Sequence, residues 1–126
     1  MSKIIFNADD LGWSRGVNQG ILKAYRYGVV NSSSWIVTTP YFDETIKLIQ
    51  ENQLANIGIH INLTEGKPLL ENHTTIVDEK GSFIRNLPNL EGINMQEVHD
   101  EIEAQIEKAL ATGIFINHMD THHHIH

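Results

Sequence analysis

Histidine is concentrated near one end of this sequence. Five of the eight histidines lie between residues 118 and 126, in the run His-Met-Asp-Thr-His-His-His-Ile-His that follows an apolar stretch. Neutral imidazole is a common protein ligand for transition metals. The chain has no cysteine, so a metal must be held by imidazole and carboxylate groups. The pattern therefore predicts a metal site without thiolate ligands.

Two other places in the chain carry residues of the same kind. Asp9 and Asp10 closely follow the apolar run 4–6, and His60 interrupts an alternating apolar segment. Two imidazoles and one carboxylate form an open metal site that can activate water, and a second carboxylate can take up the proton. Simpler interpretations also exist: the aspartates as turn and capping residues, and His60 as a hydrogen-bonded core histidine. Trp13 is either a platform that stacks on a sugar or an aromatic residue at the edge of the core.

Apolar runs alternate with amphipathic segments along the chain. Strands are predicted over residues 4–6, 29–38 and 56–63 and from 114 onward, and helices over 14–27, 39–52 and 94–112. This alternation predicts an α/β fold of parallel β-α repeats with right-handed crossovers. In such folds the site lies beyond the carboxyl ends of the strands, where the two aspartates, His60 and the terminal histidines all fall.

Cap residues predict where the helices begin and end. Ser14 and Asn94 are expected N-caps of the first and third helices. Thr39 followed by Pro40 is expected to open the second helix. Gly28 is expected to end the first helix in the left-handed conformation.

Residues 65–94 interrupt the alternation with glycines, prolines and short apolar pieces. We expect a long loop or a small hairpin there, either as a lid over the site or as a tolerated surface insertion. His73 in this insert and His99 on the polar side of the third helix are expected to be ordinary surface residues.

Length and charge exclude several classes of protein. The 126 residues allow a single domain, and the formal net charge of −7 argues against nucleic acid or an anionic membrane as a partner. No apolar run approaches the length of a membrane span, and Met1 is followed at once by a strand-like run rather than a signal peptide. We therefore expect a cytoplasmic protein.

Three stretches together resemble the YdjC/ChbG family of carbohydrate deacetylases. They are Asn-Ala-Asp-Asp-Leu-Gly at 7–12, Gly-Ile-His-Ile-Asn-Leu-Thr-Glu-Gly-Lys-Pro at 58–68 and the histidine-rich run at 118–126. The resemblance implies the first half of a (β/α) barrel of the glycoside hydrolase/deacetylase type. It also implies an enzyme that removes acetyl groups from N-acetylated sugars such as chitooligosaccharides with a divalent metal, usually magnesium.

Carried onto this sequence, the resemblance implies a role for four residues. Asp9 would be the general base, and Asp10, His60 and His122 would be the metal ligands. It makes His118, His124 and His126 residues that line the site, without a settled role. Two histidines and a carboxylate suit zinc or another transition metal better than magnesium, which prefers oxygen ligands. The ligand set and the metal implied by the family therefore disagree.

Members of the family are much longer than this chain. The resemblance thus implies an incomplete domain, residues 1–126, that lacks part of the sugar-binding pocket and is inactive alone. Unpaired sheet edges would favour association, for example as a homodimer. A metal phosphoesterase and a sugar- or metal-binding module without activity are the alternative functions.

Overall fold

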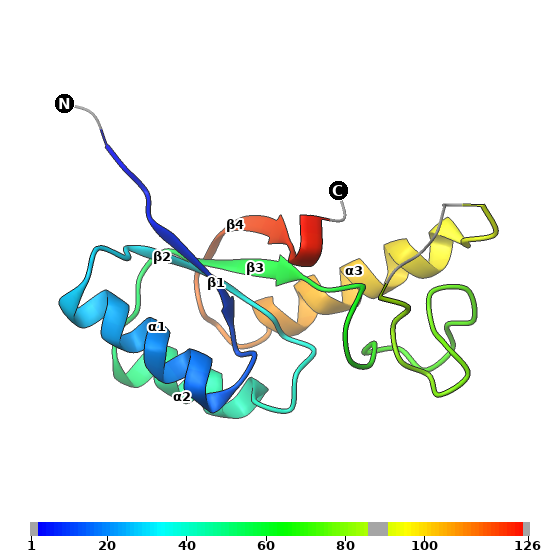
Figure 1. Ribbon diagram of the computed structural model, residues 1–126, viewed down its shortest axis with the longest axis horizontal. Helices are drawn as coiled ribbons and strands as arrows, with labels where there is room; N and C mark the ends of the chain where they lie inside the picture. Colours follow the sequence, from blue (N-terminus) through cyan, green and yellow to red (C-terminus); the bar gives the residue numbers. More distant parts are fainter. Residues whose placement is uncertain (1–2, 86–90, 125–126) are drawn as a thin grey trace.

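Four short parallel strands and three helices follow each other along the chain (Figure 1). The computed structural model describes residues 3–85 and 91–124. The strands pair in the order β1-β2-β3-β4, which is also their order in the sequence. The elements are β1 (Asn7–Leu11), α1 (Arg15–Tyr27), β2 (Ser32–Trp35), α2 (Phe42–Glu51), β3 (Ile57–Ile61), α3 (Met95–Leu110), β4 (Ile116–Thr121) and a short 3₁₀ helix, η1 (His122–His124). The predicted β-α repeat is confirmed: the chain has an α/β fold with a parallel sheet.

The hydrophobic core lies between the sheet and the helices. Its centre is formed by Trp35 of β2 and the isoleucines of β3, all 3% exposed or less, and it is closed by residues of the three helices such as Ile21, Ile49 and Ala109. The other face of the sheet carries polar side chains, and no helix in the described part of the chain covers it. One face is thus used for packing, and the other is available for chemistry.

The helix caps follow the sequence pattern in two of three cases. Ser14 Oγ accepts a hydrogen bond from the Val17 amide at 3.2 Å, and Asn94 Oδ1 accepts one from the Gln96 amide at 3.0 Å. The prediction that Thr39 and Pro40 open the second helix was wrong, since α2 begins at Phe42. The Thr39 hydroxyl instead donates to the Gly12 carbonyl at 2.5 Å, which joins the loops after β1 and β2.

Gly28 ends α1 for a different reason from the one predicted. Its φ angle is −115°, so it does not adopt the left-handed conformation. A Cβ atom at this position would lie 2.8 Å from the Ala24 carbonyl oxygen. Glycine is required here because the last turn of the helix lies too close to leave room for a side chain.

The apolar run 4–6 is not the buried strand that its composition predicted. Strand β1 begins at Asn7, and Ile4 and Ile5 are 67% and 75% exposed. The Phe6 amide donates to the side chain of Asn31 at 2.9 Å rather than to a strand partner. The predicted strand 29–38 is likewise shortened to the four residues of β2.

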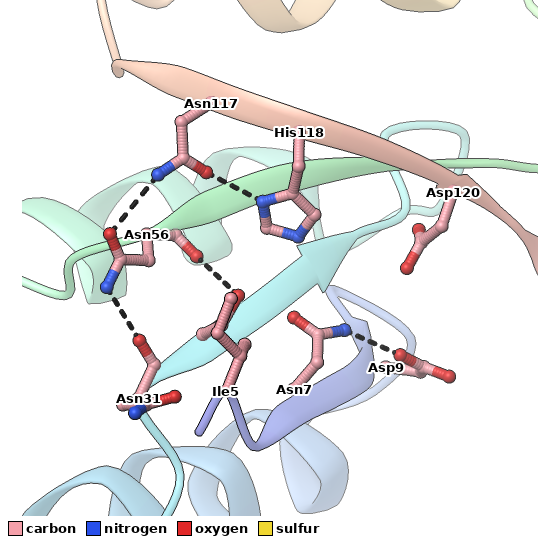
Figure 2. Close-up of a pocket in the computed structure, with 9 residues that line it drawn as sticks. Ile5, Asn7, Asp9, Asn31, Asn56, Asn117, His118 and Asp120 are labelled. Atoms are coloured by element: carbon pink, nitrogen blue, oxygen red, sulfur yellow. Dashed lines mark hydrogen bonds between the residues drawn. The ribbon is translucent and has the colours of Figure 1, made fainter. Parts of the chain in front are cut away.

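Asparagine side chains connect the strands where they begin (Figure 2). Asn117 Nδ2 donates to Asn56 Oδ1 at 3.2 Å, and Asn56 Nδ2 donates to the Asn31 carbonyl at 2.8 Å. Asn31 in turn binds the backbone on both sides of Ile5. This series of bonds, which we call the asparagine ladder, runs from β4 to the segment before β1.

The insert between β3 and α3 contains a small hairpin. This was one of the two structures predicted for it, the other being a long loop. Val77 and Phe83 form an isolated antiparallel bridge. The insert is held to α3 by Glu101, which is fully buried and accepts hydrogen bonds from the Leu69 and Leu70 amides at 3.0 to 3.1 Å. His73 also reaches Glu101, at 3.1 Å, and is 6% exposed. The prediction that His73 lies on the surface was therefore wrong.

Candidate metal centre

The end of β1 departs from regular strand geometry at the two aspartates. Neighbouring side chains of a regular strand point to opposite faces. Here the pairing with β2 shifts between Ala8 and Leu11, and Asp10 has a φ angle of +66°. Asp9 therefore lines the open face of the sheet, while Asp10 reaches the rim at the carboxyl ends of the strands. The bulge brings two adjacent carboxylates to one site.

Asp10, His60 and His122 meet at this rim, from the ends of β1, β3 and β4. Asp10 Oδ1 lies 3.4 Å from His60 Nε2 and 3.1 Å from His122 Nδ1. One ligand-type atom from each residue lies within 4.8 Å of the other two. Both histidines are buried, with exposed fractions of 4% and 6%. We call these three residues the rim cluster.

A carboxylate behind each histidine fixes its orientation. Asp120 Oδ1 lies 2.7 Å from His60 Nδ1, and Glu65 Oε2 lies 3.3 Å from His122 Nε2. Since an ionised carboxylate can only accept, each of these nitrogens donates. When the rings are neutral, as metal ligation requires, the opposite ring nitrogens, His60 Nε2 and His122 Nδ1, carry lone pairs that face Asp10. Histidines that hold metals are oriented by outer carboxylates in this way.

The rim cluster fits a divalent metal ion. Asp10 Oδ1 is buried, and no hydrogen bond of suitable geometry reaches it in the described part of the chain, although the two nitrogens are near. One carboxylate oxygen and two nitrogen lone pairs that face each other repel unless a cation lies between them. Ligand atoms around a tetrahedral zinc ion, with bonds of about 2.0–2.1 Å, are roughly 3.4 Å apart. The observed separations of 3.1 and 3.4 Å match this spacing.

Asp9 lies beside the rim cluster but outside it. It groups with His60 and Asp120, with ligand-type atoms within 4.8 Å of one another. Its side chain is exposed and accepts a hydrogen bond from Asn7 Nδ2 at 2.7 Å (Figure 2). Asp9 and Asp120 lie at the same end of a cavity of about 540 Å³ on the open face of the sheet.

The other histidines differ in position. His118 lies against Gly58, where a Cβ atom would come within 2.3 Å of its ring, and its Nε2 is 3.3 Å from Ser34 Oγ. His123 stacks on His122 with ring centroids 3.9 Å apart, and its Nδ1 is 2.9 Å from Thr64 Oγ1.

The remaining predictions for histidines concern the surface and the terminus. His99 is exposed on α3 and contacts Asp100, as expected for a surface residue. His124 is exposed in η1. His126 lies outside the described residues.

Partial desolvation lowers the pKa of the His123 imidazole, and the neighbouring His122 adds to this effect. Stacking next to another imidazole therefore favours the neutral form of His123.

Sequence reasoning missed the two outer carboxylates. Asp120 belongs to the histidine-rich run 118–126 and Glu65 to the family stretch 58–68, but neither received a role. The position of Asp120, two residues before His122 in a run that was predicted to continue the strand, could have suggested that it faces the site. Nothing in the sequence indicates that Glu65 would turn back toward His122. Trp13, whose role was left open, lies over His122 with ring centroids 5.4 Å apart.

A parallel sheet with helices on one face and a carboxylate-histidine cluster at the ends of its strands defines the class: an α/β protein with its site at the rim of a partial barrel. The model of the YdjC-like protein family matches residues 3–126. The chain belongs to this family.

Curated relatives and a solved structure extend this comparison. The chain is 47% identical to Carbohydrate deacetylase 1 from Listeria innocua over 98% of its own length and 52% of that protein. It is 41% identical to a carbohydrate deacetylase from Thermoanaerobacter pseudethanolicus, again over 98% of this chain and 51% of the relative. A crystal structure of a candidate cellobiose-phosphate cleavage protein from Enterococcus faecalis V583 superposes with a TM-score of 0.88 at 37% identity, over 96% of this chain and 48% of that one. The chain thus spans about half the length of the relatives it matches.

Among the helices that the structure describes, none is both long enough and apolar enough to cross a bilayer.

Proposed function

We propose that this chain provides the metal-binding part of a hydrolase that removes acetyl groups from N-acetylated carbohydrates of the chitooligosaccharide type. The observation that carries the proposal is the rim cluster, in which Asp10, His60 and His122 converge while Asp120 and Glu65 orient the two histidines. The names of the curated relatives support the deacetylase reaction.

The donor set favours a transition metal. One oxygen and two nitrogen ligands suit zinc, cobalt or iron, whereas magnesium prefers oxygen ligands and water. A divalent ion bound there would supply Lewis acidity toward the amide carbonyl and toward water. Asp10, His60 and His122 would hold it, and the burial of the two histidines would keep the surrounding region at low dielectric.

Asp9 is the proposed general base. It is exposed to water, it lies next to His60, and Asn7 holds its carboxylate in place at 2.7 Å. A carboxylate placed in this way can accept a proton from an attacking water molecule and hold it at one of its oxygens.

A metal phosphoesterase would need cations that can bind phosphate. Of the cations near the rim, Arg15 is paired with Glu44 at 2.9 Å and Arg85 with Glu65 at 2.8 Å, while Lys67 lines the neighbouring cavity. This neutralisation disfavours the phosphoesterase alternative.

Metal binding can be tested by calorimetry on the metal-free protein. We expect zinc or cobalt to bind more tightly than magnesium, and His60→Ala and His122→Ala each to abolish tight binding. His99→Ala is the matched control, because His99 belongs to an exposed group with Asp100 and Glu103 that could bind metal adventitiously. Loss of binding in His99→Ala, with retention in the other two variants, would contradict the proposed ligand set.

Activity can be tested by measuring acetate released from N,N′-diacetylchitobiose. The chain alone is compared with the chain joined to the part of the Listeria innocua relative that it does not cover. We expect release by the joined protein, and its loss in Asp9→Asn with metal binding retained. A joined protein that folds and binds metal but releases no acetate would favour the binding-module alternative.

A further inference from the structure

A second cavity, of about 520 Å³, opens beside the rim cluster. Its walls come from the loops that follow three successive strands: Trp13 after β1, residues 38–40 after β2 and residues 65–67 after β3. This volume lies within the range of about 300–1,000 Å³ that is usual for small-molecule sites. Its place at the carboxyl ends of parallel strands is where ligands of such folds bind.

Two residues of the wall contact His122 of the rim cluster directly. The Trp13 ring lies 5.4 Å from the His122 ring, with a tilt of 32°. Glu65 Oε2 lies 3.3 Å from His122 Nε2. A molecule in this cavity would therefore have one end at the rim cluster.

The wall combines apolar and polar surface in the way that a sugar ring requires. The C–H bonds on one face of a pyranose ring are apolar, and its hydroxyl groups point outward at the edges. Trp13 and Pro40 offer apolar surface, and Lys67 offers hydrogen-bond donors. The Thr38 hydroxyl accepts a hydrogen bond from Asn62 at 2.9 Å and can still donate its own proton to a ligand. Trp13 is partly exposed, whereas Trp35 is fully buried and stacks on Phe42. Trp13 is thus the tryptophan that a ligand can reach.

The larger cavity on the open face of the sheet is less suitable for a sugar (Figure 2). It extends to Ile5 and Asn31, which lie before the strands begin. Several of its polar side chains already bind each other, among them Asn56 and Asn117 of the asparagine ladder. Groups paired in this way have less capacity left for a ligand.

We infer that the cavity beside Trp13 binds a pyranose ring of the substrate, with the Trp13 indole stacked on the ring and the acetamido group directed at the rim cluster. The inference rests on the proposed function and adds to it the place where the sugar is held. Trp13 is a binding residue here and takes no part in proton transfer.

The test uses tryptophan fluorescence of the intact protein. The chain contains two tryptophans, and Trp35 is 0% exposed, so a bound sugar should alter the emission of Trp13. Metal-free protein is titrated with N,N′-diacetylchitobiose, which removes hydrolysis from the measurement. We expect a saturable change in emission that is absent in Trp13→Phe.

Calorimetry on the same variants separates stacking from folding. Trp13→Phe keeps an aromatic ring and should bind the disaccharide nearly as tightly as the wild type. Trp13→Ala should bind on the order of threefold to tenfold more weakly. Tyr27→Ala, at a residue that is 85% exposed on α1, should bind as the wild type does.

The inference is overturned if emission of the wild type does not respond to saturating disaccharide, or if Trp13→Phe retains the full response. Its failure can be told apart from failure of the proposed function. Sugar binding that depends on Trp13, together with no acetate release by the joined protein, would leave the cavity assignment intact and refute the hydrolase. Acetate release by the joined protein, with an unchanged KM in Trp13→Ala, would support the hydrolase and refute the cavity assignment.

Discussion

At the scale of single residues, the rim cluster is defined as much by Asp120 and Glu65 as by its three inner members. Each carboxylate engages one ring nitrogen of a histidine and so decides that the other nitrogen faces Asp10. Asp120 is itself fixed by the Ser34 hydroxyl, which donates to it at 2.6 Å. Without these partners an imidazole can rotate or change tautomer, and the convergence of lone pairs is lost.

Asp120→Asn and Glu65→Gln should each weaken metal binding about tenfold to a hundredfold, since outer carboxylates of metal-bound histidines have effects of this size. Calorimetric titration with zinc measures the change, with Asp78→Asn in the distant hairpin as the control. A second group, formed by Asp9, His60 and Asp120, could also hold an ion. If that group were the site, Glu65→Gln would leave the affinity unchanged, and the assignment to Asp10 and His122 would be wrong.

At the scale of elements, α3 holds the insert in place and so supports the rim. The Glu101 carboxylate accepts hydrogen bonds from the amides of residues 69 and 70 and also contacts the His73 ring. Gln105, one turn later, donates to Glu101 at 2.8 Å and to the Asn62 carbonyl at the end of β3 at 2.8 Å. Asn62 in turn accepts from the Glu65 amide. The hydrogen bonds are therefore continuous from the insert to the residue that orients His122.

Glu97 adds a second attachment between α3 and the insert. Desolvation alone would raise the pKa of the Glu97 carboxyl, but bonds from the amides and hydroxyls of Thr75 and Thr74 outweigh it and lower the pKa to about 2. This carboxylate therefore remains ionised, and the attachment intact, well into the acidic range.

Glu101→Gln should lower the free energy of unfolding by about 3 kcal/mol, because it removes the charge from a buried, fully hydrogen-bonded carboxylate. Chemical denaturation followed by circular dichroism measures this loss. Glu103→Gln, at an exposed position on the same helix, should change stability little. Equal effects of the two substitutions would show that the buried network does not stabilise the insert.

The sequence predicted the elements better than their ends. The alternation of strands and helices, the caps at Ser14 and Asn94 and the rim location follow from local patterns and were visible in advance. The exposure of the run 4–6 and the burial of His73 depend on contacts between distant segments, which no local pattern encodes. The same applies to Glu65, whose partner His122 lies 57 positions away.

At the scale of the whole molecule, the sheet has two edges. Each of β1 and β4 pairs with a single neighbouring strand. Exposed apolar residues lie at both edges: Ile4, Ile5 and Phe6 just before β1, and Phe115 and Met119 at β4. Open edges of parallel strands with apolar side chains favour pairing with another chain or segment.

We expect the isolated 126 residues to sediment at a mass above that of one chain. The double variant Phe115→Ser and Met119→Lys should shift the protein toward monomer, because it places polar groups at the β4 edge. Leu110→Ser, which alters an exposed apolar residue of α3 away from that edge, is the control. A monomeric wild type at high concentration would refute the expectation.

The backbone of Asp10 has a consequence for how this chain can evolve. A left-handed residue other than glycine costs on the order of 1 kcal/mol or more, and glycine at position 10 would avoid most of that cost. Selection for a more stable fold and selection for the rim cluster therefore act in opposite directions at this one position. Screens that reward thermal stability alone would tend to replace this aspartate, and the more stable variant would lack one of the proposed metal ligands.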